Sequence, residues 1–218
     1  MLGGMVFMFL DEINIKKEYI FGLVYTFCFL IIIGLINYFT WTEGPVTNIK
    51  FTNICIWAAL YLPFFSYYYI FDDWKIKEFG FALNYRVFFI LIAVFIFVLF
   101  NYHLFSFDNW KTSFIEMFAR TGEELFFRGF LYALFLRIFK NKDKSWIWAV
   151  ISSSICFSLV HTQTFLAGYD ATMIDIFILA LIIAISRKLT DSILLGIVIH
   201  VLIKSNILGV CFGIAGYF

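Results

Sequence analysis

The sequence predicts an all-α fold, a polytopic bundle of transmembrane helices. The chain is 63% hydrophobic and only 14% charged, with a mean hydropathy of +0.92, values outside the range of ordinary soluble domains. Apolar stretches close to the ~20 residues that cross a bilayer recur along its whole length. Because backbone polar groups cannot stay unpaired in lipid, each stretch is expected to be a helix. Residues 1–218 are therefore expected to form a single integral membrane domain within the lipid bilayer.

Successive apolar segments set the expected number of spans at about seven, with six to eight as the range. Their approximate ranges are 19–39, 52–70, 86–105, 112–139, 145–162, 171–186 and 191–212. The four cysteines lie inside these segments and show neither metal-ligand nor redox spacing, so they are expected to be packing residues. No internal repeat and no soluble domain is evident.

Basic residues between the segments orient the expected bundle. Eleven lysines and arginines fall at alternate ends of the segments: Lys16, Lys17, Lys75, Lys77, Arg86, Arg137, Lys140, Lys142, Lys144, Arg187 and Lys188. Only Lys50 and Lys111 fall at the opposite ends. The positive-inside rule then predicts a multi-pass protein of the cell membrane with its N-terminus in the cytoplasm. A net charge of +1 gives no indication of nucleic-acid binding.

The fourth segment contains charges where lipid or a packed core is expected. The stretch "TGEELFFRGFLYALFLRIFK", residues 121–140, carries Glu123, Glu124 and Arg128. A charge near the middle of a membrane costs several kcal/mol, and such groups usually face a bundle interior and serve a function. A purely structural buried network is the alternative.

Helical spacing separates the two glutamates. Glu116, Arg120, Glu124 and Arg128 recur every four residues and therefore share one helix face, which suits a structural ladder of ion pairs around Glu124. Glu123 lies about 100° away around the helix. Nearby cations neutralise the Glu123 carboxylate less well than the Glu124 carboxylate. In a site of low dielectric constant the pKa of Glu123 is therefore expected to be raised, which suits a general base.

Two further segments supply imidazoles. His161 ends the fifth segment with Phe157 one turn before it, and His200 lies inside the last segment with Lys204 one turn later. Glu123, His161 and His200 could converge around one water molecule. Alternatively, His161 lies at the membrane interface, and His200 is a core residue whose ring is hydrogen-bonded within the bundle and has no catalytic role. A zinc site made by the same three residues is chemically possible, although the sequence contains no His-Glu-x-x-His motif.

Three motifs in this order resemble a known family. They are "EELFFR" at 123–128, "FSLVH" at 157–161 and "HVLIK" at 200–204. Together they resemble the signature of the CAAX protease and bacteriocin-processing family (CPBP, or Abi), over a family core of about 111–212. Members of that family are helical intramembrane endopeptidases of the glutamate type.

The resemblance implies a role for each motif residue. Glu123 and His161 would activate a water, while His200 and the residue one turn after it would stabilise the oxyanion. Glu124 and Arg128 would support the site, as would Phe157. The resemblance also implies that neither a catalytic metal nor another cofactor takes part.

The third motif departs from the family pattern at Lys204, where Asn or Asp is usual. Asn206 lies about 240° around the helix from His200 and cannot replace it. Three interpretations remain open for Lys204. It donates to the oxyanion itself, it extends to the membrane interface, or the site is inactive.

The expected function is therefore hydrolysis of a membrane-associated peptide or protein. Bacteriocin maturation, processing of signal peptides and self-immunity are the roles that the resemblance suggests, besides removal of a C-terminal tripeptide from prenylated proteins. The alternative from a different class is a non-proteolytic immunity or regulatory protein that binds a membrane-protein partner through the same bundle. A transporter is a third possibility. Substrate, cleavage site, side of substrate entry and oligomeric state stay open.

Overall fold

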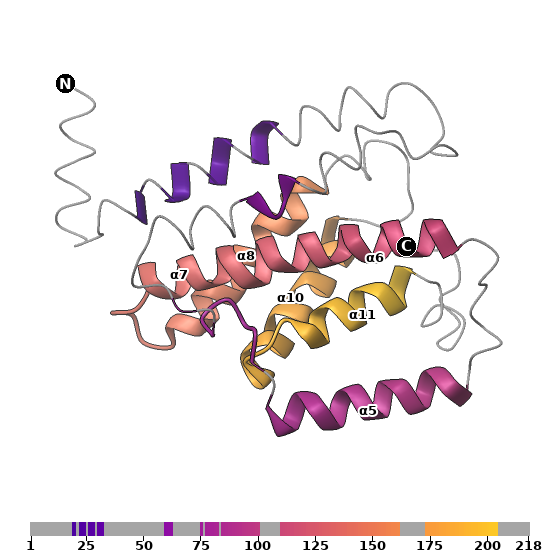
Figure 1. Ribbon diagram of the computed structural model, residues 1–218. Coiled ribbons are helices and arrows are strands. Elements are labelled where there is room, and N and C mark those ends of the chain that lie inside the picture. Colours follow the sequence, from indigo (N-terminus) through magenta and orange to yellow (C-terminus); the bar gives the residue numbers. More distant parts are fainter. Residues whose placement is uncertain are drawn as a thin grey trace, which may run out of the picture.

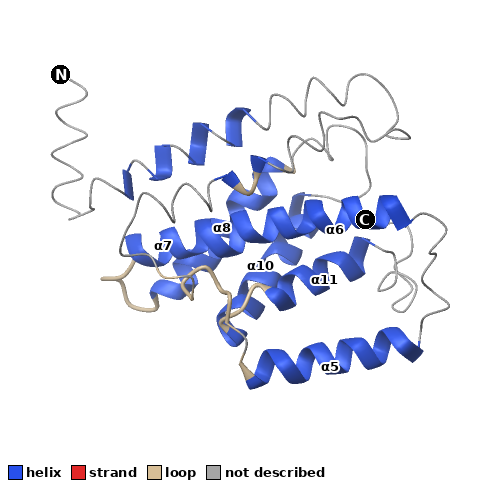
Figure 2. Cartoon of the chain, viewed as in Figure 1, coloured by secondary structure: helices blue, strands red, loops and turns tan. Residues whose placement is uncertain are grey.

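The fold of the described residues is entirely helical, which confirms the predicted all-α class for this part of the chain. The computed structural model describes residues 19–20, 22–24, 26–28, 30–32, 59–62, 75, 77–82, 84–100, 110–161 and 173–204. No strand occurs among these residues (Figure 2). Most of the predicted segments at 19–39 and 52–70 lies outside them.

Helices occupy each of the later predicted segments. They are α5 (Tyr85–Phe100), α6 (Trp110–Glu124), η3 (Leu125–Leu131), α7 (Tyr132–Ile138), α8 (Ser145–Val160), α10 (Met173–Thr190) and α11 (Leu194–Lys204). α6, η3 and α7 follow one another without a break, as predicted for 112–139. Neither proline of the sequence, Pro45 or Pro63, falls within this part of the chain, so nothing there removes a helical N–H donor.

Within the described residues, no helix combines the length and the apolar character required to span a bilayer. The number of spans and the orientation of the chain stay predictions.

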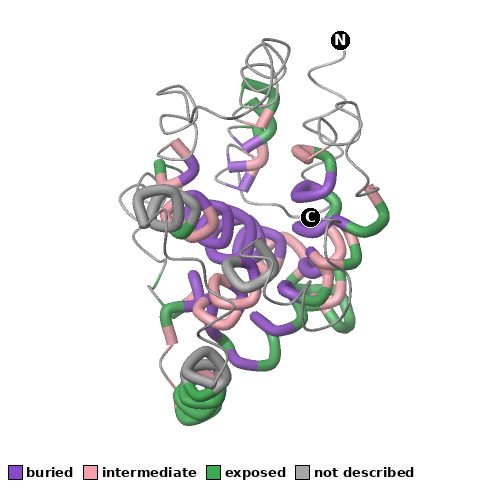
Figure 3. Tube along the Cα trace, turned by 90° about the vertical axis from the view of Figure 1, so that its right-hand side faces the viewer, coloured by how far each residue is buried: buried purple, intermediate pink, exposed green. Residues whose placement is uncertain are grey.

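The continuous helix from α6 to α7 forms the centre of the bundle. α8 packs against α7 and η3, α10 lies along α8, and α11 returns across α6 (Figure 1). α5 contacts α11 and forms the lowest helix in Figures 1 and 3, with mostly exposed side chains where they are described. The buried residues gather mainly on η3, α7, α8 and α10.

The middle of the central helix is a π-helix, η3, all of whose residues are buried. A π-helix carries an extra residue per hydrogen-bonded turn, and short π segments are frequent at functional sites. Gly129 lies inside η3, and a Cβ added there would come within 3.2 Å of the carbonyl oxygen of Phe79. Phe79 is itself fully buried. A glycine in η3 thus permits close approach of the segment that precedes α5.

That preceding segment ties the end of α7 to the turn between α10 and α11. Arg137 donates to the Glu78 carboxylate at 2.9 and 2.6 Å. Arg187 donates to the Glu78 carbonyl oxygen at 3.0 Å. The Ile193 N–H donates to the Gly80 carbonyl oxygen at 2.9 Å. Residues 78–80 therefore hold α7, α10 and the start of α11 together.

Gly80 provides a test of this arrangement. Its φ is +90°, and a Cβ there would overlap Arg187 Nε and lie 2.9 Å from Ile193 Cγ2. We expect Gly80→Ala to lower the free energy of unfolding by about 1–3 kcal/mol, measured as a lower melting temperature of the full-length protein. Lys144→Gly is the control, because Lys144 also has a positive φ (51°) but lies at an exposed turn. An unchanged melting temperature for Gly80→Ala would contradict this prediction.

Candidate active site

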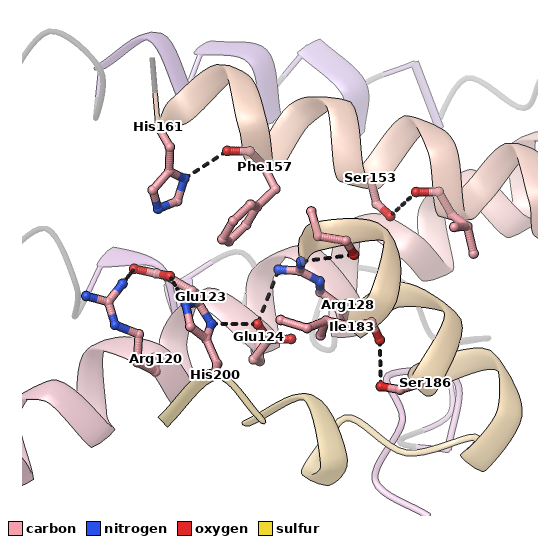
Figure 4. Close-up of polar contacts among 12 residues, drawn as sticks. Arg120, Glu123, Glu124, Arg128, Ser153, Phe157, His161, Ile183, Ser186 and His200 are labelled. Atoms are coloured by element: carbon pink, nitrogen blue, oxygen red, sulfur yellow. Dashed lines mark hydrogen bonds and ion pairs between the residues drawn. The ribbon is translucent and has the colours of Figure 1, made fainter. Parts of the chain in front are cut away.

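Residues from four elements meet at the C-terminal end of α6 (Figure 4). They are Arg120, Glu123 and Glu124 on α6, Arg128 on η3, Phe157 and His161 at the end of α8, and His200 on α11. Glu123, Glu124, Arg128, Phe157 and His200 are all buried. The structure therefore brings together every predicted site residue except Lys204.

Glu124 occupies the centre of this polar cluster. Its Oε1 accepts from Arg128 Nη1 at 3.2 Å and from His200 Nδ1 at 2.9 Å, and its side chain is fully buried. Arg128 also donates from Nη2 to the Ala180 carbonyl oxygen on α10, at 3.3 Å. Glu124 thus connects η3 with α11, and the Arg128–Glu124 pair lies where the four-residue spacing predicted it.

Glu123 uses its two oxygens differently. Oε1 accepts from Arg120 Nη1 at 2.7 Å, and Oε2 lies 3.6 Å from His200 Nε2. In the part of the chain that the structure describes, Oε2 has no hydrogen-bond partner. One oxygen is therefore fixed, and the other faces an imidazole nitrogen.

The pairing of Arg120 corrects one sequence-based expectation. The Glu123 carboxylate was expected to be poorly neutralised by nearby cations, and Arg120 was expected to belong to the ladder around Glu124. Arg120 instead pairs with Glu123. Residues three and four apart are both neighbours on a helix, so spacing alone could not decide between the two carboxylates. Arg120 pairs with Glu123 rather than Glu124 because the His200 ring occupies the position beside Glu124.

The ring of His200 lies between both carboxylates. Because a carboxylate oxygen accepts, the Nδ1 bonded to Glu124 carries a proton. In a neutral ring Nε2 is then an acceptor, and it faces another acceptor, Glu123 Oε2. Either a proton on Nε2 or a water within reach of both atoms makes this approach favourable. A water that donates to both atoms would therefore satisfy Glu123 Oε2 and His200 Nε2 together.

His161 approaches the same region from the end of α8. Its Nδ1 donates to the Phe157 carbonyl oxygen at 2.8 Å, since a carbonyl can only accept. In Figure 4 the ring points from α8 toward the side of the site where Glu123 and Arg120 lie. Its local hydrogen bond fixes the tautomer in which Nδ1 carries the proton and Nε2 is an acceptor.

Phe157 separates the charged and imidazole groups. Its ring stacks on His161 at 4.3 Å between centroids and meets His200 edge-on at 5.9 Å. The Arg128 guanidinium carbon lies 4.3 Å from its centroid, within the range of a cation–π contact. A single aromatic ring therefore sets the spacing among three polar side chains, consistent with a supporting role.

Two predicted participants cannot be placed. The backbone of Lys204 ends α11, but its side chain lies outside the described residues, as does that of Glu116. Their expected roles stay predictions. Among the residues that the structure does describe, no group of three or more His, Cys, Asp or Glu side chains has the arrangement of a metal site.

Gly196 is a site residue that sequence reasoning missed. It lies one turn before His200 on α11, and a Cβ there would come within 2.8 Å of Glu124 Oε2 and of Ile183 Cγ2. A glycine inside an apolar helix was the available signal, because such a residue often has a packing reason. Here it makes room for a carboxylate oxygen between α6, α10 and α11.

We expect Gly196→Ala to lower the melting temperature, although alanine is favoured over glycine in a helix by about 1 kcal/mol. The added methyl group must displace Glu124 or Ile183, which disturbs the hydrogen bond between Glu124 and His200. A graded series of Ala, Ser and Val at this position should give progressively lower melting temperatures. A melting temperature at or above that of the wild type would show that α11 accommodates the methyl group.

Comparison with known proteins bears on the family resemblance of this part of the chain. The family model described as type II CAAX prenyl endopeptidase Rce1-like matches residues 106–205. No curated protein and no solved structure shows significant similarity to the chain. The matched segment contains all three motifs, and it confirms the resemblance inferred from them. Residues 106–205, which contain every site residue described above, are therefore similar to the Rce1-like family of type II CAAX prenyl endopeptidases.

Proposed function

We propose that this chain is an intramembrane glutamate-type endopeptidase that hydrolyses a membrane-associated peptide or protein without a metal. The observation that carries this proposal is the placement of Glu123 Oε2 3.6 Å from His200 Nε2, while Arg120 holds Oε1 at 2.7 Å. A buried carboxylate with one oxygen directed at an imidazole suits activation of a water.

Glu123 is the proposed general base. A water held by Glu123 and His161 transfers a proton to the carboxylate as its oxygen attacks the scissile carbonyl carbon. The tetrahedral intermediate then breaks its C–N bond, and the same proton passes from Glu123 to the leaving amine. The reaction consumes one water, and Glu123 returns to its ionised form.

His200 is the proposed oxyanion donor. Its Nδ1–H stays bonded to Glu124, so only Nε2 can serve the substrate. When Nε2 carries a proton, it donates to the oxyanion while Glu124 compensates the charge of the ring. Removing a donor of this kind from a dry site typically costs ~10²-fold or more in rate.

Composition and family support a membrane setting for this reaction. We propose a multi-pass helical protein of about seven spans with its N-terminus in the cytoplasm. The substrate is proposed to be a peptide rather than a prenylated protein, in maturation of a bacteriocin or signalling peptide or in self-immunity. Because the matched family is described as CAAX prenyl endopeptidases, a prenylated CAAX peptide must be tested beside unprenylated peptides.

Replacement of Glu123 tests the proposal. Full-length protein in detergent micelles is incubated with a peptide library, half of it carrying S-farnesyl cysteine, and products are identified by mass spectrometry. We expect Glu123→Gln to reduce cleavage by ~10²-fold or more, because the amide cannot accept the proton. Asp143→Asn, in an exposed loop, is the matched control and should cleave like the wild type.

The same variant separates proteolysis from a binding function. In cells, Glu123→Gln should abolish the phenotype and change the profile of membrane peptides if the chain is a peptidase. A phenotype that survives Glu123→Gln would instead favour the non-proteolytic immunity or regulatory protein.

Lys204 requires its own test. We propose that its ammonium group donates to the oxyanion in place of the usual Asn or Asp. Lys204→Met should then lower kcat by about tenfold or more, while Lys204→Asn should retain a larger share of the activity. An unchanged rate for Lys204→Met would remove Lys204 from the mechanism.

A further inference from the structure

Arg120 lies outside all three sequence motifs but directly contacts the proposed base. It stands three residues before Glu123 on α6, and its Nη1 donates to Glu123 Oε1 at 2.7 Å. The side chains of this pair are only 12% and 8% exposed. This contact lies within α6, and an intrahelical pair of this kind adds little to the stability of an isolated helix.

Charge balance gives the pair a different importance. Among the described residues of the cluster, each of the two carboxylates has its own arginine. Without Arg120, the buried Glu123 carboxylate would lose the cation that is hydrogen-bonded to it, and a buried carboxylate without such a partner tends to take up a proton instead. A proton on Glu123 would remove the base.

Orientation gives a second consequence. The terminal torsion of a glutamate is broad and nearly two-fold, so either oxygen could face His200. Arg120 binds Oε1, and Oε2 then faces Nε2 of the imidazole at 3.6 Å. A displacement of about 1 Å in a reacting group can cost ~10²-fold in rate.

We infer that Arg120 is a positioning residue, which keeps Glu123 ionised and directs its Oε2 to the water that attacks the substrate. This inference rests on the proposed function, since it assigns a role in the same reaction. It accounts for a largely buried ion pair that the family signature does not include.

The experiment compares Arg120→Ala and Arg120→Lys in full-length protein, using the library peptide that the wild type cleaves fastest. Arg120→Ala should lower kcat by about tenfold or more and leave KM within about threefold, because ground-state binding does not use this group. Arg120→Lys, which keeps the charge, should recover most of kcat. Methylguanidinium added to the assay should partly restore Arg120→Ala and have no effect on Glu123→Gln. Lys142→Met, which removes an exposed loop charge, is the control and should match the wild type.

The outcomes separate this inference from the proposed function. If the wild type cleaves no peptide, or Glu123→Gln cleaves as well as the wild type, the proposed function is wrong and the inference fails with it. If Glu123→Gln is inactive but Arg120→Ala keeps its kcat, only the inference is wrong. A loss of kcat that neither lysine nor methylguanidinium restores, together with a lower melting temperature, would assign Arg120 a structural role and overturn the inference.

Discussion

The buried carboxylate of Glu124 is the interaction on which the rest of the site depends. Its Oε1 binds Arg128 and His200 at once, so η3 and α11 are both fixed relative to α6. A carboxylate removed from water is tolerated only with such partners. Gly196 belongs to the same constraint, because any side chain there would occupy the space of the second oxygen of Glu124. The closest approach of α11 is therefore limited by a buried carboxylate as well as by the apolar side chain of Ile183.

The arrangement around Glu123 follows from that constraint. Once Nδ1 of His200 is committed to Glu124, its Nε2 must face the other side of the ring, where Glu123 lies at 3.6 Å. Adjacent glutamates on one helix thus address opposite edges of one imidazole. Phe157 separates the ring of His200 from that of His161 and carries the guanidinium of Arg128 on its face. Two adjacent acids with the same chemistry acquire different surroundings, and a different role is proposed for each.

Much of this architecture could be predicted from the sequence, because apolar runs and four-residue spacing are local properties. The segment 145–162 became α8 nearly at its predicted bounds, and Arg128 pairs with Glu124 as its spacing indicated. The pairing of Arg120 could not be predicted. On a helix it neighbours both glutamates, and the choice depends on His200, which is remote in sequence. The π-helix of η3 was likewise not predicted, since its residues continue the same apolar pattern as α7.

The segment before α5 shows why the motif-bearing residues alone do not define the site. It precedes the matched segment, yet the Gly80 carbonyl oxygen accepts from the N–H of Ile193, the residue immediately before α11. Arg187, at the end of α10, is bound to the Glu78 carbonyl oxygen of the same segment. The start of α11 is thereby fixed by residues outside the family motifs. Because α11 is a helix of fixed rise, fixing its start also fixes the position of His200 along its axis.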